Sequence, residues 1–331
     1  MERVAILGTG GMGSALALLL ARSGHPVRLW GRDPAQVEQI VRDRENRRHL
    51  AGIPLPEEVE PTADAERATG DADLIIAAIP SAFLRSTLSA VAGQIPQNRP
   101  VVSVVKGIER ATFARPTEVI RAVLGPRPIA VLSGPSHAEE LARGLPASVV
   151  VAGPVEALNL RVQTLLNSDR LRVYTNPDAI GVELAGALKN VLGVAAGICD
   201  GLNLGDNTKA ALLTRGLAEM TRFAVALGGR PETFLGLAGV GDLVTTCYSP
   251  HGRNRSLGER IGRGATLDEA AAELSGVAEG AYTARSVEQQ ARQIGVEMPI
   301  TREVDQILYE DRSPWEAVSA LMLRMPKEEG T

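Results

Sequence analysis

A short glycine-rich segment near the start of the chain restricts the possible folds most strongly. Gly8, Gly10 and Gly13 fit the pattern G-x-G-x-x-G, which here follows the apolar run Val4–Leu7 and precedes a helix-like stretch, Ser14–Ser23. In this context the first glycine allows a tight turn, the second lets a pyrophosphate approach the backbone, and the third lets helix and strand pack closely. The anion would lie on the unpaired N–H groups at the start of the helix. The segment therefore predicts a dinucleotide-binding strand–turn–helix unit.

The rest of the first half alternates strand-like and helix-like segments. Its strand-like runs are almost continuously apolar, which is typical of parallel strands covered by helices on both faces. We expect strands at Val4–Leu7, Val27–Trp30, Leu74–Ile79, Val101–Val105, Ile129–Leu132 and Ser148–Val151, and helices at Ser14–Ser23, Pro34–Glu45, Ala82–Ala92 and Arg115–Leu124. Residues 1–180 are therefore predicted to form a Rossmann-like, doubly wound α/β domain with a parallel sheet that binds NAD or NADP.

From about Gly181 the strand-like runs disappear, and stretches rich in Ala, Leu, Glu and Arg replace them. We expect helices at Val182–Cys199, Thr208–Leu227, Leu267–Ala272, Tyr282–Ile294, Ile300–Glu310 and Pro314–Leu323, and a loop at the glycine-rich segment Leu235–Asp242. The sequence thus predicts an all-helical second domain over residues 181–331.

Composition excludes several classes of function. The net charge of −4, without any run of basic residues, argues against nucleic acid as a partner. Two cysteines are too few for a disulfide framework, so a reducing cytoplasm is expected. The apolar stretches are shorter than the roughly 18 residues of a membrane span, so membrane insertion is not expected. Four scattered histidines show no metal-ligand spacing, and we predict no metal site.

The end of the second predicted strand bears on the choice of cofactor. There Arg32 precedes Asp33, and an arginine suits the 2′-phosphate of NADP whereas an acid suits the ribose of NAD. Because Arg32 comes first, NADP is the preferred prediction. Alternatively, Arg32 is solvated and Asp33 only caps the helix that begins at Pro34.

Lysine is rare in this chain, since only four of its 35 basic side chains are lysine. Lys106 follows a predicted parallel strand, at the edge of the sheet where α/β proteins bind ligands. Lys189 lies within an apolar helix, where lost hydration would lower its pKa and suit it to proton transfer. The alternatives are a solvated turn lysine at 106 and a snorkelling lysine at 189.

A third group of polar residues follows the glycine-rich segment. Asp242 and Thr246 are followed by Gly252, Arg253 and Asn254, which together offer a carboxylate, a hydroxyl, a guanidinium and a carboxamide. Such groups suit recognition of a phosphate or a carboxylate, although a helix start with a solvated basic cluster would have the same composition. With the two lysines, they predict a dehydrogenase that uses a lysine as proton donor.

These strings together resemble the bacterial-type NAD(P)-dependent glycerol-3-phosphate dehydrogenase family. The resemblance rests on GTGGMG (8–13), SVVKGIE (103–109), SGPSHAEE (133–140), GALKNVLGVAAGICDGL (186–202), KAALLTRGLAEM (209–220), ETFLGLAGVGDLVTTC (232–247) and GRNR (252–255), in the order in which the family has them. The set extends over nearly the whole chain.

The resemblance implies reversible reduction of dihydroxyacetone phosphate to sn-glycerol 3-phosphate by a homodimer, with the product feeding phospholipid synthesis. By motif position it implies catalysis by Lys189, Lys106 and Asp242; substrate binding by these three with Gly134, Ser136, Thr246, Gly252, Arg253 and Asn254; and cofactor binding by Gly8, Gly10, Gly11, Met12, Gly13, Arg32, His49, Lys106, Ala138, Arg253, Val277 and Glu279. The chain departs from the family at Gly11 and Met12, where Ser and an aromatic residue are common, and at Gly252, where Ser is common. An open alternative is a related two-domain reductase of a small hydroxy acid.

Overall fold

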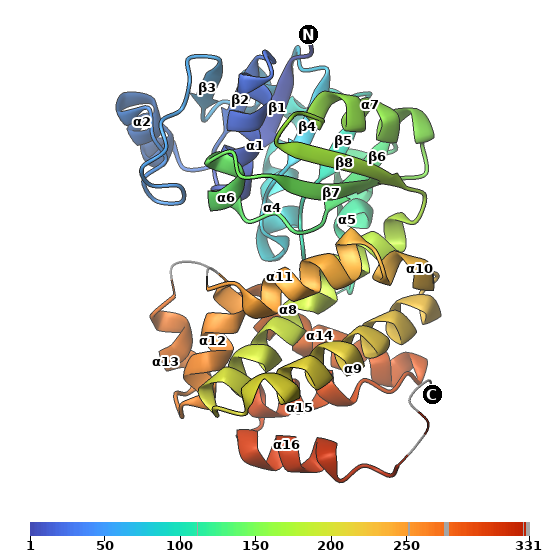
Figure 1. Ribbon diagram of the computed structural model, residues 1–331. Coiled ribbons are helices and arrows are strands. Elements are labelled where there is room, and N and C mark those ends of the chain that lie inside the picture. The colour runs from blue at the N-terminus through green and yellow to red at the C-terminus, as the bar shows by residue number, and fades with distance from the viewer. Residues whose placement is uncertain (111, 251, 275–277, 327, 329–331) are drawn as a thin grey trace.

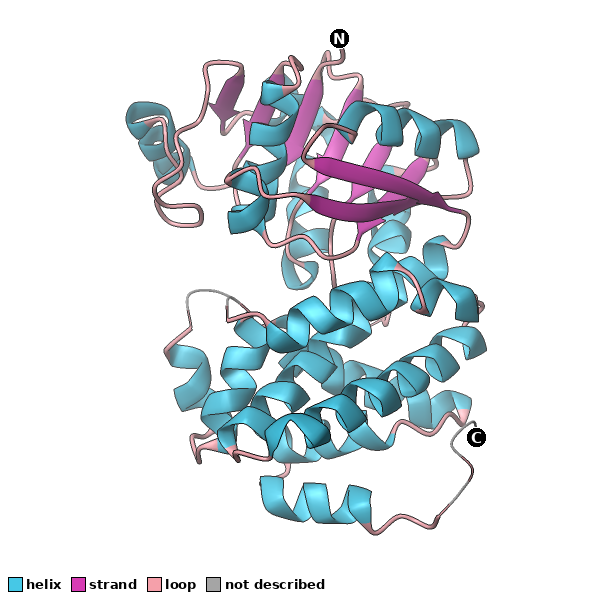
Figure 2. Ribbon diagram, viewed as in Figure 1, coloured by secondary structure: helices cyan, strands magenta, loops and turns pink. Residues whose placement is uncertain are grey.

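The structure is a computed structural model that describes residues 1–331 except 111, 251, 275–277, 327 and 329–331. A sheet with helices on both faces stands above a bundle of helices (Figure 1 and Figure 2). The first part contains β1 (Val4–Leu7), α1 (Gly11–Arg22), β2 (Val27–Trp30), α2 (Pro34–Asp43), β3 (Val59–Thr62), α3 (Ala65–Thr69), β4 (Leu74–Ala77), α4 (Ser81–Val91), η1 (Ala92–Gln94), β5 (Val101–Ser103), α5 (Pro116–Leu124), β6 (Ile129–Ser133), α6 (Ala138–Ala142), β7 (Ala147–Ala152), α7 (Glu156–Leu166) and β8 (Leu171–Asn176). The second part contains α8 (Ala179–Gly201), α9 (Gly205–Ala226), α10 (Pro231–Phe234), η2 (Leu237–Gly241), α11 (Asp242–Tyr248), α12 (Arg253–Gly262), α13 (Leu267–Ala272), α14 (Glu279–Ile294), α15 (Pro299–Tyr309) and α16 (Pro314–Met322).

Among the described residues, the strands form one 8-stranded sheet in the order β3-β2-β1-β4-β5-β6-β7-β8. Strands β1 to β6 pair in parallel, in the order typical of dinucleotide-binding sheets, with the switch point between β1 and β4. Strand β7 is antiparallel to β6, with Ser133 opposite Val150, and β8 is parallel to β7. The predicted Rossmann-like class is confirmed, but the expectation of a wholly parallel sheet is wrong at β7.

Strand β1 explains why its sequence is continuously apolar. Successive side chains of a strand point to opposite faces of the sheet. Val4 and Ile6 belong to the core that also includes residues of α1 and α7, and Ala5 and Leu7 to the core shared with α3, α4 and α5. Because helices cover both faces, no position in the strand faces water.

Two strands escaped the sequence analysis because both lie at the edges of the sheet. Strand β3 contains Pro61, which cannot donate a ladder hydrogen bond and is tolerated at an edge. Strand β8 alternates, with Leu171 and Val173 buried and Arg172 and Tyr174 exposed. Neither strand therefore has the apolar run that marked the inner strands.

Helix α8 is the centre of the second part and packs against α9, α11, α12 and α14. It begins where the Asp178 side chain accepts a hydrogen bond from the Gly181 N–H at 2.8 Å. By length and composition α8 could cross a membrane, but its apolar window is wholly buried inside the protein. That burial is what is expected of a core helix that is apolar on all sides.

The segment expected to be a loop is mostly helical, which corrects the prediction for Leu235–Asp242. It forms the π-helical turn η2 and leads into α11, and α12 follows shortly after. Neither helix was predicted from the sequence, and neither were the short helices α3, α6 and α10 and the longer α7. Strand β8 ends at Asn176 and α8 begins at Ala179, and the division into residues 1–180 and 181–331 stays a prediction.

Candidate active site

The three glycines of the first motif each meet a different spatial demand. Gly8 has φ +125°, and a Cβ there would lie 2.4 Å from the carbonyl oxygen of Ala78. A Cβ on Gly13 would lie 2.0 Å from the carbonyl oxygen of Gly8. A Cβ on Gly10, in contrast, would meet nothing within 4 Å, so the backbone there is open to an approaching group. This is the arrangement expected of a turn that binds a pyrophosphate.

The start of α1 is suited to an anion. Gly10 is its N-cap and offers no side-chain acceptor, and the first turn contains no acidic residue. The unpaired N–H groups therefore face the open side of the loop. A Cβ on Gly11 would lie 3.3 Å from Cβ of Ala138 and 3.4 Å from the carbonyl oxygen of His49, so both predicted cofactor residues border this turn. Met12 lies half-buried beside them.

Asn46 is a residue of this loop that the sequence analysis missed. Its Nδ2 donates to the carbonyl oxygen of Thr9 at 2.7 Å and to Oγ of Ser14 at 2.8 Å. The side chain is buried, and it joins a loop after α2 to the glycine turn. No local pattern marks Asn46, because its partners lie 37 and 32 residues earlier in the chain.

Arg32 and Asp33 take separate roles at the end of β2. The Asp33 carboxylate accepts from the Ala35 N–H at 3.1 Å and caps α2, as one of the two interpretations expected. Arg32 is exposed, with its guanidinium 5.8 Å from the centre of the Phe83 ring. A cation is thus presented at the carboxyl edge of the sheet, beside an exposed aromatic ring.

Two lysines from different parts of the chain meet at one carboxylate. Lys189 Nζ lies 2.6 Å from Oδ1 of Asp242, and Lys106 Nζ lies 2.8 Å from Oδ2. Lys189 also donates to Oγ1 of Thr246 at 2.7 Å. Lys106 follows β5, Lys189 lies in α8, and the other two residues begin and continue α11. Lys189 is therefore bound by Asp242 and Thr246 inside the protein, which contradicts the alternative of a snorkelling lysine with its amine in water.

Burial and mutual charge set the protonation of this centre. Burial is the main influence on the Lys189 ammonium, and it lowers its pKa to about 8 against the opposing effect of Asp242. Burial alone would raise the pKa of Asp242, but Lys106 and Lys189 outweigh it, and the pKa is lowered. The carboxylate is therefore ionised, and Lys189 can exchange a proton near neutral pH.

The loop after β6 orients Lys106. Its Nζ donates to the carbonyl oxygen of Gly134 at 2.8 Å and contacts Oγ of Ser136 at 3.3 Å. Gly134 has φ +121°, and a Cβ there would lie 3.1 Å from Cα of Val149 on β7. The close passage of β7 thus requires glycine at this position.

The first turn of α12 brings the predicted phosphate-binding residues to the same region. Gly252 is its N-cap, and Arg253 is exposed. Asn254 Nδ2 donates to Oδ1 of Asn190 at 3.0 Å, and its Oδ1 accepts from the Gly280 N–H at 2.9 Å. The Asn254 carboxamide is thus largely engaged within the protein, which leaves Arg253 as the more available group.

Asn190 links the two parts of the site, although the predicted set did not include it. Its Nδ2 donates to the carbonyl oxygen of Lys106 at 3.0 Å, while its Oδ1 accepts from Asn254. Its sequence signals were its place next to Lys189 and its helical spacing with Gly186, Gly193 and Gly197. One carboxamide thereby connects the loop after β5 to the start of α12.

Glu279 lies between the sheet and the helical bundle. Its Oε1 accepts from the N–H and the Oγ of Ser81, both at 3.0 Å, at the start of α4. Burial raises the pKa of this carboxyl, and the bonds from Ser81 oppose that shift. Ser81 was not predicted, and Val277 lies outside the described residues.

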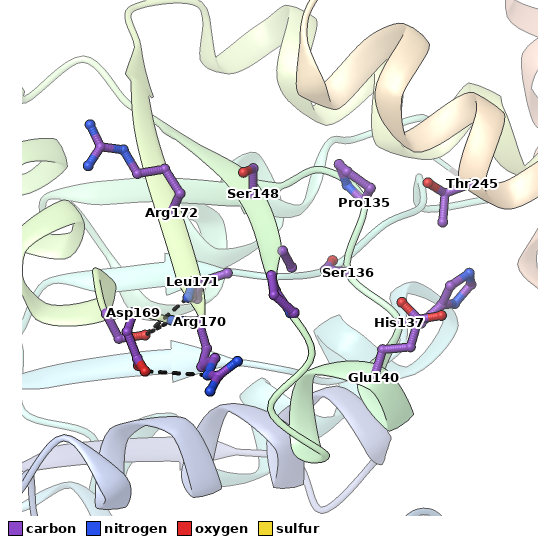
Figure 3. A pocket seen from close by; sticks show the side chains of 13 residues that line it. Pro135, Ser136, His137, Glu140, Ser148, Asp169, Arg170, Leu171, Arg172 and Thr245 are labelled. Atoms are coloured by element: carbon purple, nitrogen blue, oxygen red, sulfur yellow. Dashed lines mark hydrogen bonds and ion pairs between the residues drawn. The ribbon is translucent and has the colours of Figure 1, made fainter.

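A cavity of about 500 Å³ lies near the cluster of Lys106, Lys189 and Asp242, and Figure 3 shows the side chains that line it. It lies between the loop after β6, the starts of β7 and β8, and Thr245 on α11. Ser136 belongs to both places, since it lines the cavity and contacts Lys106. Glu140, Asp169, Arg170 and Arg172 give the cavity mixed charge, and the two central lysines do not line it.

Comparisons with known proteins agree with this geometry. The family model for the N-terminal part of NAD-dependent glycerol-3-phosphate dehydrogenase matches residues 3–158. The family model for its C-terminal part matches residues 178–319. The chain is 48% identical to the glycerol-3-phosphate dehydrogenase (NAD(P)+) of Chlorobium limicola, over 98% of this chain and 99% of that protein. It is 50% identical to the protein of that name from Thermus thermophilus, over 99% of this chain and 100% of that protein.

A crystal structure of glycerol-3-phosphate dehydrogenase from Coxiella burnetii has the same fold, with a TM-score of 0.94 and 39% identity over 98% of this chain and 99% of that one. The resemblance seen in the motifs is thus confirmed over both parts of the molecule. This chain belongs to the NAD-dependent glycerol-3-phosphate dehydrogenase family.

Proposed function

We propose that this enzyme reversibly reduces dihydroxyacetone phosphate to sn-glycerol 3-phosphate with NADPH or NADH. The observation that carries the proposal is the buried Lys189 ammonium, whose pKa is lowered to about 8 and which Asp242 and Thr246 orient beside Lys106. A proton donor of this kind suits reduction of a carbonyl group near neutral pH. Support also comes from the names of close relatives.

The residues present fit a nicotinamide dinucleotide. The open backbone at Gly10 and the uncapped start of α1 would hold the pyrophosphate, with Gly8, Gly11, Met12, Gly13, His49 and Ala138 bordering it. Arg32 is exposed where a 2′-phosphate would need a cation, which favours NADP over NAD. Lys106, Arg253, Val277 and Glu279 complete the proposed cofactor set. When bound, the nicotinamide supplies the hydride that reduces the carbonyl carbon.

Lys189 is the proposed general acid of the reduction. Two of its N–H bonds are engaged by Asp242 and Thr246, which leaves a third for the substrate carbonyl oxygen. Transfer of that proton turns the developing alkoxide into the product hydroxyl, and the neutral amine accepts the proton in the reverse direction. The Asp242 carboxylate keeps enough positive charge on Lys189 for this exchange.

Lys106 is proposed to stabilise the negative charge that develops on the same oxygen. Its Nζ already contacts Gly134, Ser136 and Asp242, and the contact with Ser136 is the longest of the three at 3.3 Å. Of the three contacts, the one with Ser136 can therefore be exchanged for a contact with the substrate oxygen at the smallest cost in free energy. A fixed cation of this kind needs little reorganisation during the reaction.

The substrate phosphate is assigned to the start of α12. Arg253 can bind a phosphate dianion with two parallel hydrogen bonds, and the N–H groups after Gly252 favour an anion. Asn254, Gly134, Ser136 and Thr246 would surround the rest of the substrate. The alternative, a reductase of a small hydroxy acid, would use Arg253 for a carboxylate instead.

The decisive experiment measures NADPH and NADH oxidation by the purified protein with three carbonyl substrates. We expect turnover of dihydroxyacetone phosphate, far lower kcat/KM with unphosphorylated dihydroxyacetone, and none with a 2-oxo acid such as ketopantoate. Turnover of the oxo acid in preference to the phosphate would replace the proposal with its alternative.

The cellular setting remains part of this proposal. We propose a cytoplasmic homodimer whose product supplies phospholipid synthesis, without insertion into the membrane and without a nucleic-acid partner. Sedimentation of the purified protein tests the dimer. Depletion of the protein in cells, followed by glycerol 3-phosphate rescue of phospholipid labelling, tests the metabolic role.

A further inference from the structure

Lys209 is a buried lysine that the function proposed above does not use. It lies near the start of α9 and is 7% exposed. Its Nζ is 2.5 Å from Oδ1 of Asp200, in the last turn of α8. Oδ2 of the same carboxylate lies 2.7 Å from Nε of Arg255 on α12. One aspartate therefore joins cations from two other helices.

Lys209 also contacts the helix that carries Asp242 and Thr246. Its Nζ lies 4.8 Å from the centre of the ring of Tyr248, the last residue of α11, which is within the range of a cation–π interaction. Arg255 lies in the first turn of α12, two residues after Arg253. Lys209 thus supports the end of α11 directly and the start of α12 through Asp200.

Close packing alone does not fix where the start of α12 lies. A Cβ on Gly197 would be 1.9 Å from the carbonyl oxygen of Arg255, so the α12 backbone rests directly on α8. Such contact sets the distance between α8 and α12. The glycines of α8 present no side chains, so they offer little resistance to sliding of α12 along α8. The ion pair of Arg255 with Asp200 is directional, and together with the hydrogen bond from Asn254 to Asn190 it fixes the position of α12 along α8. The pair of Arg255 with Glu259, at 3.6 Å, lies within α12 and cannot do so.

We propose that Lys209 is a positioning residue for the substrate phosphate. It holds the Asp200 carboxylate in the orientation that binds Arg255, and this places Arg253 at the phosphate. The proposal rests on the function proposed above. It predicts that loss of Lys209 weakens binding of the phosphorylated substrate while the chemistry at Lys189 continues.

The test compares Lys209→Met with the wild type on dihydroxyacetone phosphate and on unphosphorylated dihydroxyacetone. We expect KM for the phosphorylated substrate to rise about five- to fifty-fold, because a small displacement of a binding group has a large effect on affinity. The kcat for that substrate, and kcat/KM for dihydroxyacetone, should stay within about two-fold of the wild type. An unchanged KM in the folded variant, or equal losses on both substrates, overturns the proposal.

A matched control and a second variant guard against a general loss of stability. Arg222→Met removes a cation of the same helix that donates to the Glu297 carbonyl oxygen, away from Asp200 and Arg255, and it should leave activity on both substrates unchanged. Arg255→Gln, at a partly exposed side chain, should reproduce the KM effect even if Lys209→Met does not fold.

The double variant of Lys209 and Arg255 tests whether the two residues act through one link. Its KM should lie within about two-fold of that of the worse single variant. If the rise in KM of the double variant equals the product of the two single rises, the two residues act independently and the link through Asp200 is overturned. Absence of wild-type activity on dihydroxyacetone phosphate would instead refute the proposed function, so the two failures are distinguishable.

Discussion

The ammonium of Lys189 lies 2.6 Å from Oδ1 of Asp242, and both side chains are buried. Burial disfavours the charged form of the lysine, whereas the carboxylate favours it, and the balance lowers the pKa to about 8. The residue can therefore be charged before proton transfer and neutral after it within the physiological pH range.

The pH dependence of the reaction should follow this balance. The kcat/KM for reduction should fall above about pH 8, because Lys189 loses the proton that it must donate. The kcat/KM for glycerol 3-phosphate oxidation should rise through the same range, because oxidation needs the neutral amine. Initial rates in both directions, in buffers of constant ionic strength, check this. Parallel pH profiles in the two directions would exclude Lys189 as the titrating group.

Asp242→Asn should move the alkaline limb of the reduction profile to lower pH. Removal of the carboxylate charge removes the interaction that raises the Lys189 pKa, so the pKa of Lys189 falls further. The variant should consequently lose more activity at pH 8 than at pH 6. A profile that keeps its shape while its height falls would show that Asp242 orients the lysine without tuning its charge.

Lys189→Ala should lower kcat by about 10² to 10⁴, the usual contribution of a positioned general acid. NADPH binding should persist, because the glycine loop and Arg32 lie on other elements. Fluorescence titration of NADPH beside steady-state kinetics separates the two effects. Retention of more than about half the turnover would rule out a general-acid role on this scale.

Arg32→Ala should weaken the binding of NADPH much more than the binding of NADH. Only NADPH carries the 2′-phosphate, and a charge-assisted hydrogen bond to it is worth roughly 1.5 to 3 kcal/mol, or about ten-fold or more in affinity. The control is Arg42→Ala, an exposed arginine of α2 that pairs with Asp43 and should change neither cofactor. Equal losses for both cofactors would mean that Arg32 contacts a part that they share.

Arg253→Ala should lower kcat/KM for dihydroxyacetone phosphate by roughly ten- to a hundred-fold, through loss of a charge-assisted pair with the phosphate. Unphosphorylated dihydroxyacetone should hardly be affected. Arg260→Ala serves as the control, since this arginine lies on the same helix and pairs with the exposed Glu273. If both substrates lose activity alike while the variant stays folded, the carboxylate-binding alternative regains support.

The inner strands and long helices could be predicted because their signals are local. The apolar run Val4–Leu7 and the glycine spacing after it need only their own residues to indicate a strand and a tight turn. Strand β8 gave no such signal, because only one of its faces is buried and its sequence therefore alternates. Helices α11 and α12 were missed because packing against α8, rather than their own periodicity, makes them helical.

The sequence by itself singled out most of the residues proposed for the chemistry, through rare lysines, glycine spacing and the motifs shared with a family. Only the tertiary structure decided how they act together. Lys189 and Asp242 are 53 residues apart, and Lys106 and Asp242 are 136 residues apart. Their pairing depends on α8 and α11 packing beneath the carboxyl edge of the sheet. The pKa of Lys189 depends in turn on that packing, because burial and a charged neighbour are properties of the folded interior and not of a residue type.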